Sequence, residues 1–295
     1  MEVLDAQVHL WELNASGRAL DETILNQVGD AVKNSVWEFF RSNSLTASQF
    51  VREMDLAKVT GALVVTPTLY RDNSYSLSAC RDHPGRYRVV GSVDPLRPDI
   101  EELMTDWPKQ PGMAGVRIMA LNATTQSALD CGAYDALLRG ARKGPLTVCI
   151  LAPNHAAGIA AVARRFDDVQ FVVDHLGILP DPLNPSSLPL NALTQTIEAL
   201  SPLQNVSLKL GNIPALSDSG VPFPDILPHV HRILDSFGPD RVMWASDHSW
   251  YLHLPYRTHV DVVRENTGLS ETDRQWLLAG ALRRAFRWPA GQAYY

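Results

Sequence analysis

Three apolar segments of the chain end in side chains that are able to exchange protons. His9 closes the first segment, His175 follows Val172-Val173-Asp174, and Asp247 follows Met243-Trp244-Ala245-Ser246. A carboxylate near two imidazoles can hold a water molecule, take its proton and return it to a leaving oxygen, which is general acid–base catalysis. We therefore predict Asp247, His9 and His175 as catalytic residues. The alternative for Asp247 is a helix cap, and for His175 a structural pair with a neighbouring group.

The first segment carries polar residues at alternate positions. Asp5, Gln7 and His9 are two residues apart, and on a strand such residues point to one side. Three polar side chains on one face of a buried strand are costly unless they meet partners or a ligand. A single buried histidine is more often structural, but the shared face favours a site that includes His9 and Gln7.

Two cations lie inside otherwise apolar segments. Arg117 stands in Gly115-Val116-Arg117-Ile118, and Lys209 stands in Ser207-Leu208-Lys209-Leu210. Long cations at such positions either pair with buried carboxylates or bind an anionic or carbonyl-rich substrate. We favour substrate binding for Arg117 and leave both roles open for Lys209.

Several further residues flank these segments. Aromatic residues beside the motifs are expected to wall the substrate pocket, or simply to pack, and His248 is included with the substrate-binding residues. The histidines in predicted helices and loops are expected at the surface. The residues expected at the pocket are Trp11, His248, Trp250 and Tyr251. The histidines expected at the surface are His229, His231, His253 and His259.

Short apolar, β-branched runs recur along the whole chain and alternate with helix-like stretches. Their near-continuous hydrophobicity is typical of parallel strands covered on the outside. Eight such runs, with the first almost at the N-terminus, suit a closed (β/α)8 barrel better than an open sheet. The runs are 3–9, 62–66, 87–93, 115–119, 146–150, 170–174, 206–210 and 241–245.

The helical stretches predict the connections of that barrel. They are expected at 46–59, 127–142, 156–166, 190–200 and 224–237. Two insertions, 11–44 and 178–189, follow predicted strands one and six, where barrel enzymes place their substrate loops. No linker or repeat divides the chain, so we predict one domain over residues 1–295, a distorted TIM barrel with loop insertions at its C-terminal face.

Composition narrows the classes of function. The chain has 295 residues, 45% of them hydrophobic, and a net charge of −6 without a long run of like charges. A nucleic-acid or membrane partner is therefore not expected, and a small molecule is the predicted substrate. The three cysteines share no short spacing, which favours a reducing compartment. We predict a cytoplasmic protein, with a homodimer as one option for its assembly.

Taken in order, these motifs resemble the amidohydrolase-2 group of metal-dependent hydrolase barrels. The similarity is greatest to its lactonase branch, which includes 2-pyrone-4,6-dicarboxylate lactonase and sugar lactonases. It covers nearly the whole chain, and only the ordered set of motifs is specific. The matching stretches are 5–11, 54–59, 72–75, 83–87, 115–117, 174–177, 209–211 and 245–247.

Two departures from the family pattern concern metal and substrate. Gln7 stands where the resemblance implies the first histidine of a metal-binding pair, and an amide oxygen is a poor zinc ligand. The lactonase branch contains members that work without metal, which this sequence resembles. We predict no tightly bound cofactor, with a divalent metal such as zinc as the alternative. His248 replaces a tryptophan common in the family, which leaves the shape of the pocket open.

The resemblance implies hydrolysis of a lactone or related cyclic ester. Asp247 would activate water, His9, His175 and Lys209 would stabilise the oxyanion, and Arg117 would orient a carboxylate or carbonyl. A first alternative is non-oxidative decarboxylation of an aromatic or unsaturated carboxylic acid, which related barrels perform with a metal. A second is a binding protein that has lost catalysis together with the first histidine.

Overall fold

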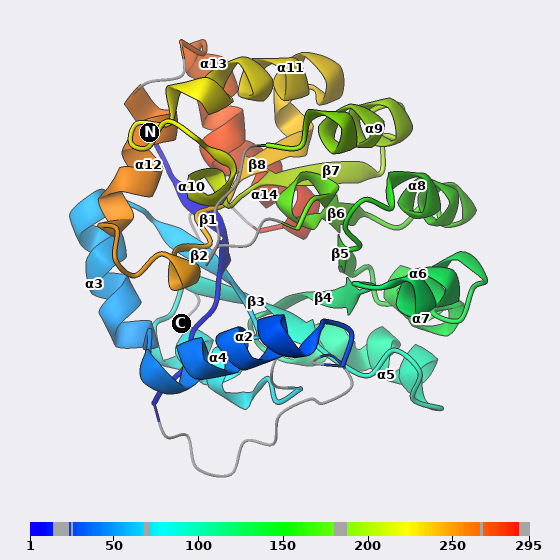
Figure 1. Ribbon diagram of the computed structural model, residues 1–295. Helices are drawn as coiled ribbons and strands as arrows, with labels where there is room; N and C mark the ends of the chain where they lie inside the picture. The colour runs from blue at the N-terminus through cyan, green and yellow to red at the C-terminus, as the bar shows by residue number, and fades with distance from the viewer. Residues whose placement is uncertain (14–23, 25, 68–70, 180–187, 266–267, 289–295) are drawn as a thin grey trace.

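The computed structural model describes residues 1–13, 24, 26–67, 71–179, 188–265 and 268–288. Eight parallel strands form one sheet in which each strand pairs with the next in chain order. Helices surround this sheet (Figure 1). The predicted (β/α)8 barrel is confirmed. The strands are β1 Leu4–Val8, β2 Gly61–Val65, β3 Tyr87–Ser92, β4 Met113–Met119, β5 Thr147–Leu151, β6 Phe171–Val173, β7 Val206–Leu210 and β8 Val242–Trp244.

The first and last strands of the barrel meet through a group of hydrogen bonds that we call the β1–β8 seam. The Ser246 amide donates to Asp5 Oδ1 over 2.9 Å, and the Asp247 amide donates to the Gln7 carbonyl over 3.0 Å. The His9 amide donates to Ser249 Oγ over 3.1 Å. Side chains therefore carry much of the junction that closes the barrel.

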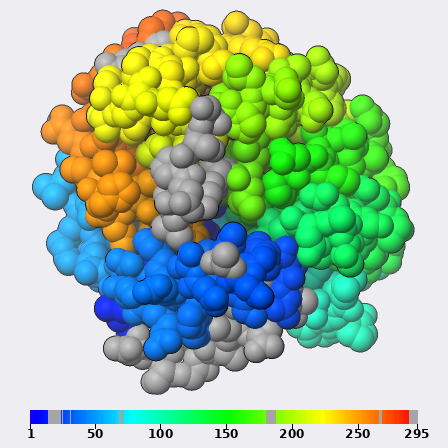
Figure 2. All heavy atoms as spheres, in the orientation of Figure 1, coloured from blue at the N-terminus to red at the C-terminus, as the bar shows by residue number. Residues whose placement is uncertain are grey.

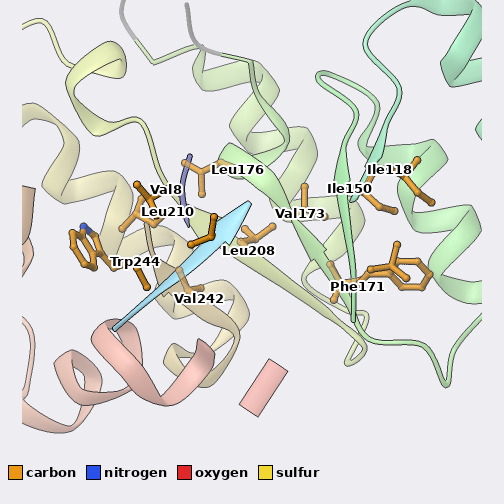
Figure 3. Packing of buried hydrophobic residues seen from close by; sticks show 14 of the residues in the cluster. Val8, Ile118, Ile150, Phe171, Val173, Leu176, Leu208, Leu210, Val242 and Trp244 are labelled. Atoms are coloured by element: carbon orange, nitrogen blue, oxygen red, sulfur yellow. The ribbon is translucent and has the colours of Figure 1, made fainter. Parts of the chain in front are cut away.

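Alternation along the strands divides the apolar residues between two layers. One cluster includes Val65, Cys149 and Val172, and it continues to α14, which covers one end of the barrel interior. The other cluster lies between strands and helices, and Figure 3 shows part of it, including Val173 and Leu208. Burying one such side chain contributes about 1.5–3 kcal/mol. Together the layers hold the strand ends in a fixed arrangement.

Each of the five predicted helical stretches is helical in the structure, one of them is divided, and further helices occur that were not predicted. The predicted helix 127–142 is two helices, because Gly132 adopts φ 84° between them and a left-handed residue breaks the hydrogen-bond ladder. The helices are α2 Asp30–Ser42, α3 Ala47–Ala57, α4 Ser74–Asp82, α5 Ile100–Asp106, α6 Ala123–Asp130, α7 Asp135–Lys143, α8 Ala156–Arg165, α9 Leu190–Leu200, α10 Ile213–Leu216, α11 Leu227–Phe237, α12 Tyr256–Glu265, α13 Glu271–Gln275 and α14 Ala281–Phe286.

The first predicted insertion contributes α2, which lies across one face of the molecule (Figure 2). An aromatic cluster fastens it there: the ring of Trp11 lies 4.6 Å from Phe40, and Phe39 stacks on Trp250 at 5.0 Å. Residues 14–23 and 25 of this insertion, and residues 180–187 of the second, lie outside the described residues.

No helix in the described ranges is both long enough and apolar enough to cross a membrane.

Candidate active site

The three predicted catalytic side chains meet where their strands end. Asp247 Oδ1 lies 3.6 Å from His9 Nε2, and Asp247 Oδ2 lies 3.7 Å from His175 Nε2. Both His175 and Asp247 have left-handed backbone conformations, with φ 51° and φ 49°. Such conformations are costly for residues other than glycine and occur often at functional sites. The turns after β6 and β8 therefore direct an imidazole and a carboxyl group toward each other.

The orientation of His9 follows from its second nitrogen. His9 Nδ1 lies 2.8 Å from the carbonyl oxygen of Val65, at the end of β2. A carbonyl only accepts hydrogen bonds, so Nδ1 carries the proton in the neutral ring and Nε2 has a free electron pair. That electron pair faces Asp247. The two groups are thus arranged as a pair of acceptors.

Burial controls the charge of these groups. It raises the pKa of Asp247 to about 7, with the positive charge of Arg117 acting in the opposite direction. It lowers the pKa of His9 to about 3, and the pKa of His175 is also lowered to about 3 by burial. Near neutral pH the histidines are uncharged and Asp247 divides between its acid and its carboxylate. This is the range that a general base needs.

The two buried cations share one carboxylate. Arg117 Nε donates to Asp174 Oδ2 over 2.7 Å, and Lys209 Nζ lies 2.9 Å from Asp174 Oδ1. Although burial opposes ionisation of Asp174, the charges of Lys209 and Arg117 hold its pKa below the ordinary value. The sequence offered carboxylate pairing or substrate binding for each cation. Both pair with Asp174, and Arg117 also reaches a cavity, whereas Lys209 has an exposed fraction of 0%.

Gln7 connects this charged group to His175. Lys209 Nζ donates to Gln7 Oε1 over 2.8 Å, and Gln7 Nε2 lies 3.3 Å from His175 Nε2. An ammonium group only donates, so the oxygen of the Gln7 amide must face Lys209. The amide nitrogen therefore faces the imidazole, and Gln7 offers no oxygen to the space between the histidines.

One prediction for β1 is wrong: Asp5 does not share a face with Gln7 and His9. The pairing of β1 with β2 shifts between Asp5 and Val8, so β1 has one residue more than its partner over this stretch. Such a bulge reverses the alternation. Asp5 consequently contacts Ser246 and the hydroxyl of Tyr256, away from the histidines.

Two of the predicted substrate-binding residues are placed apart from the reacting groups. Trp11 is buried in the aromatic cluster, where its Nε1 donates to the Asn43 carbonyl over 2.7 Å. The ring of His248 is buried against Tyr256 and lies 5.3 Å from the ring of His259. His259 was expected at the surface. It is buried instead, because it lies on the inner face of α12.

Sequence reasoning missed Asn212. It follows β7 with φ 58°, and its side chain lies 3.1 Å from His175 Nδ1. The hydroxyl of Tyr251, which was expected only as part of the pocket wall, donates to Asn212 Oδ1 over 2.9 Å. The signal for Asn212 was its place directly after Lys209-Leu210-Gly211, at the end of a strand.

A cavity of about 90 Å³ lies beside the site, at the ends of β2, β3 and β4. Arg117 is the member of the candidate site that lines it, and Thr66, Ser92 and Tyr134 are among the other lining residues. Arg71, a further lining residue, pairs with Asp94 at 2.9 Å. The cavity can thus receive a small polar molecule next to a guanidinium group.

The fold and this site define a class of protein. The family model described as "Amidohydrolase" matches residues 5–288, and the chain belongs to this family. The resemblance inferred from the motifs is confirmed.

Individual relatives share part of the sequence. The chain is 29% identical to a 4-sulfomuconolactone hydrolase from Rhizobium radiobacter over 61% of this chain and 58% of that protein. It is 26% identical to an L-fucono-1,5-lactonase from Burkholderia ambifaria over 54% of each chain. The matches thus span little more than half of these relatives' length.

A solved structure shares the fold over nearly the whole chain. It is an amidohydrolase from Burkholderia multivorans with bound zinc, with a TM-score of 0.77 and 19% identity over 98% of this chain and 100% of that chain.

Proposed function

We propose that the protein hydrolyses a lactone or related cyclic ester, with Asp247 as the general base. The observation that carries this proposal is the buried Asp247 carboxyl between the Nε2 atoms of His9 and His175, with a pKa of about 7. The names of both partial relatives, a muconolactone hydrolase and a fuconolactonase, agree with this reaction class.

The free electron pair of His9 gives the proposed base a partner. Asp247 and His9 Nε2 together accept both hydrogens of one water molecule, so its oxygen electron pair points to the substrate. The water oxygen attacks the lactone carbonyl carbon while a proton passes to Asp247. The ring C–O bond then breaks, and Asp247 returns the proton to the leaving alkoxide. The product is a hydroxy acid, which releases one proton to solvent as it ionises.

Arg117 and Lys209 have different roles in this proposal, one by direct contact with the substrate and one through neighbouring residues. Arg117 lines the cavity and binds a carbonyl or an anionic group of the substrate. Lys209 is fully buried against Gln7 and Asp174, so it acts through them. It fixes the Gln7 amide and contributes positive potential toward the oxyanion that forms.

The residues do not fit a tightly held divalent metal, and we propose a metal-independent reaction. Two histidines and a carboxylate have suitable donor atoms. However, Arg117 and Lys209 already supply two positive charges against Asp174, and Gln7 presents its amide nitrogen. A further dication at this place would be repelled by both.

The experiment that tests the function is a substrate panel followed by proton release. Purified protein is incubated with dihydrocoumarin, glucono-1,5-lactone, 2-pyrone-4,6-dicarboxylate and a set of aromatic carboxylates, with and without chelator and zinc. We expect one proton per lactone opened, and unchanged rates after prolonged chelation. Release of CO2 from aromatic carboxylates, with loss of activity on chelation, would instead establish the decarboxylase alternative. The cytoplasmic location, the homodimer and the single-domain assignment stay predictions.

A further inference from the structure

Asp5 is a fully buried carboxylate that contacts none of the three reacting side chains. Its Oδ1 accepts from the amides of Ser246, over 2.9 Å, and of Gln7, over 3.0 Å. Its Oδ2 accepts from the Ser246 hydroxyl and from the Tyr256 hydroxyl, the latter over 2.9 Å. Four donors thus converge on one side chain at the β1–β8 seam.

These bonds fix the residue next to the proposed base. The Ser246 hydroxyl also accepts from the backbone amide of His248 over 3.0 Å. Ser246 therefore contacts the residue that follows Asp247 and helps to fix the turn in which Asp247 lies. Asp247 itself has φ 49° and ψ 31°, a left-handed conformation that is strained for a residue with a Cβ. Only a turn fixed by other contacts keeps it there.

We propose that Asp5 is the positioning residue for Asp247 and that it acts through Ser246, with Tyr256 as its support. Only a carboxylate offers two oxygens that both accept, which the four donors require. An amide would direct its NH2 group at one of them. Tyr256 extends the support outward, because its ring packs on Phe50 of α3 at 4.8 Å.

We expect that weakening the hydrogen bonds between Asp5, Ser246 and Tyr256 lowers kcat without altering substrate affinity. The variants are Asp5→Asn, Tyr256→Phe, Ser246→Ala and Ser246→Thr, assayed with the lactone of the panel above that has the highest kcat/KM. A displacement of about 1 Å costs up to ~10²-fold in rate, so we expect kcat to fall ~30-fold or more in Asp5→Asn and several-fold in Tyr256→Phe, with KM within about twofold. Ser246→Thr restores the hydroxyl and should recover most of what Ser246→Ala loses.

A matched control separates positioning from general weakening of the fold. Thr147 is buried in β5 and donates to the Ala285 carbonyl over 2.5 Å, away from the β1–β8 seam. Thr147→Val should lower the melting temperature as much as Tyr256→Phe does, and leave kcat unchanged. Equal losses of kcat in these two variants, or unchanged kcat in folded Tyr256→Phe and Ser246→Ala, would overturn the proposal. Those two milder variants decide the matter where Asp5→Asn does not fold.

The kinetic measurements rest on the proposed function. Crystal structures of the variants test the positioning role without depending on it. In Tyr256→Phe and Ser246→Ala we expect the Asp247 carboxyl to move away from its position 3.6 Å from His9 Nε2. An unmoved carboxyl in both variants would overturn the positioning role. If the wild type opens no lactone, the proposed function fails, and the crystal structures still test whether Asp5 positions Asp247 through Ser246.

Discussion

At the scale of single residues, Asp247 is the group on which the proposed chemistry depends. Asp247→Asn keeps the shape of the side chain and removes the base, so kcat should fall by ~10² or more. The same variant should be at least as stable as the wild type above pH 7, because it removes the cost of ionising a buried carboxyl whose pKa is raised to about 7. Activity and melting temperature are measured at pH 5 and 8. A variant that retains more than about a tenth of kcat excludes Asp247 as base.

The pKa of Asp247 also sets the pH dependence of the reaction. A general base acts in its ionised form, so kcat/KM should rise as pH increases through about 7 and then level off. The histidines, with pKa values of about 3, stay neutral over this range and add no step. A profile from pH 5 to 9 checks this. A falling limb in place of the rise would mean that the protonated carboxyl is the active form.

Arg117 has a contact with the cavity and a contact with Asp174. Arg117→Met should raise KM for an anionic lactone more than it lowers kcat, as expected for a contact made in both ground and transition states. Arg117→Lys should recover only part of the effect, because an ammonium group cannot replace a planar fork of donors. Steady-state kinetics on an anionic and a neutral lactone separate the two roles of Arg117. If KM does not change with either substrate, Arg117 acts only on Asp174.

At the scale of elements, α3 supports the helix that carries Tyr256. It begins with a capping box in which the Thr46 hydroxyl accepts a hydrogen bond from the backbone amide of Gln49 over 3.2 Å. Thr46→Ala should lower the free energy of unfolding by about 1 kcal/mol. Thr124 is exposed near the start of α6, so Thr124→Ala is a control expected within about 0.5 kcal/mol. Urea titration of both variants measures the difference, and equal stabilities would show that the box contributes little.

The elements were predictable from sequence to different degrees. The strands were found because continuous apolar runs mark a covered parallel sheet, and the break at Gly132 was overlooked although glycine favours that conformation. The bulge in β1 could not be found, because one inserted residue leaves the hydrophobic pattern nearly unchanged while it turns Asp5 outward. The contact of Asn212 with His175, and the pairing of Asp174 with both Arg117 and Lys209, could not be predicted. They depend on which strand ends become neighbours, and only the fold determines that.

At the scale of the whole molecule, buried titratable groups should make the fold sensitive to acid. Burial lowers the pKa of four histidines, His9, His175 and His259 to about 3 and His248 to about 4. Each therefore stabilises the fold above the unfolded pKa of about 6.5 and loses that contribution as pH falls. Burial raises the pKa of Asp5 to about 6 and of Asp247 to about 7, which has the opposite effect.

Near pH 5 the four histidines are protonated only in the unfolded chain, and the two carboxyls are protonated only in the folded chain. The unfolded chain therefore binds about two more protons than the folded chain. Stability should then fall by roughly 3 kcal/mol per pH unit as the solution is acidified. Urea unfolding from pH 7 to 5 measures this slope. His259→Phe should reduce the difference in bound protons between the unfolded and folded states by about one, and the slope should fall accordingly. A stability that does not change over this range would contradict neutral burial of these rings.

The β1–β8 seam also has a consequence for biosynthesis. Asp5 and Ser246 are 241 positions apart, so a ribosome adding ~5–20 residues per second exposes the first about 12–48 s before the second. During that interval the nascent chain holds a carboxylate whose partners Ser246 and Tyr256 do not yet exist. The proposed catalytic centre therefore assembles only after β8 has been synthesised. A chain released before residue 247 lacks the proposed base, so we expect it to be inactive even where the earlier strands have formed.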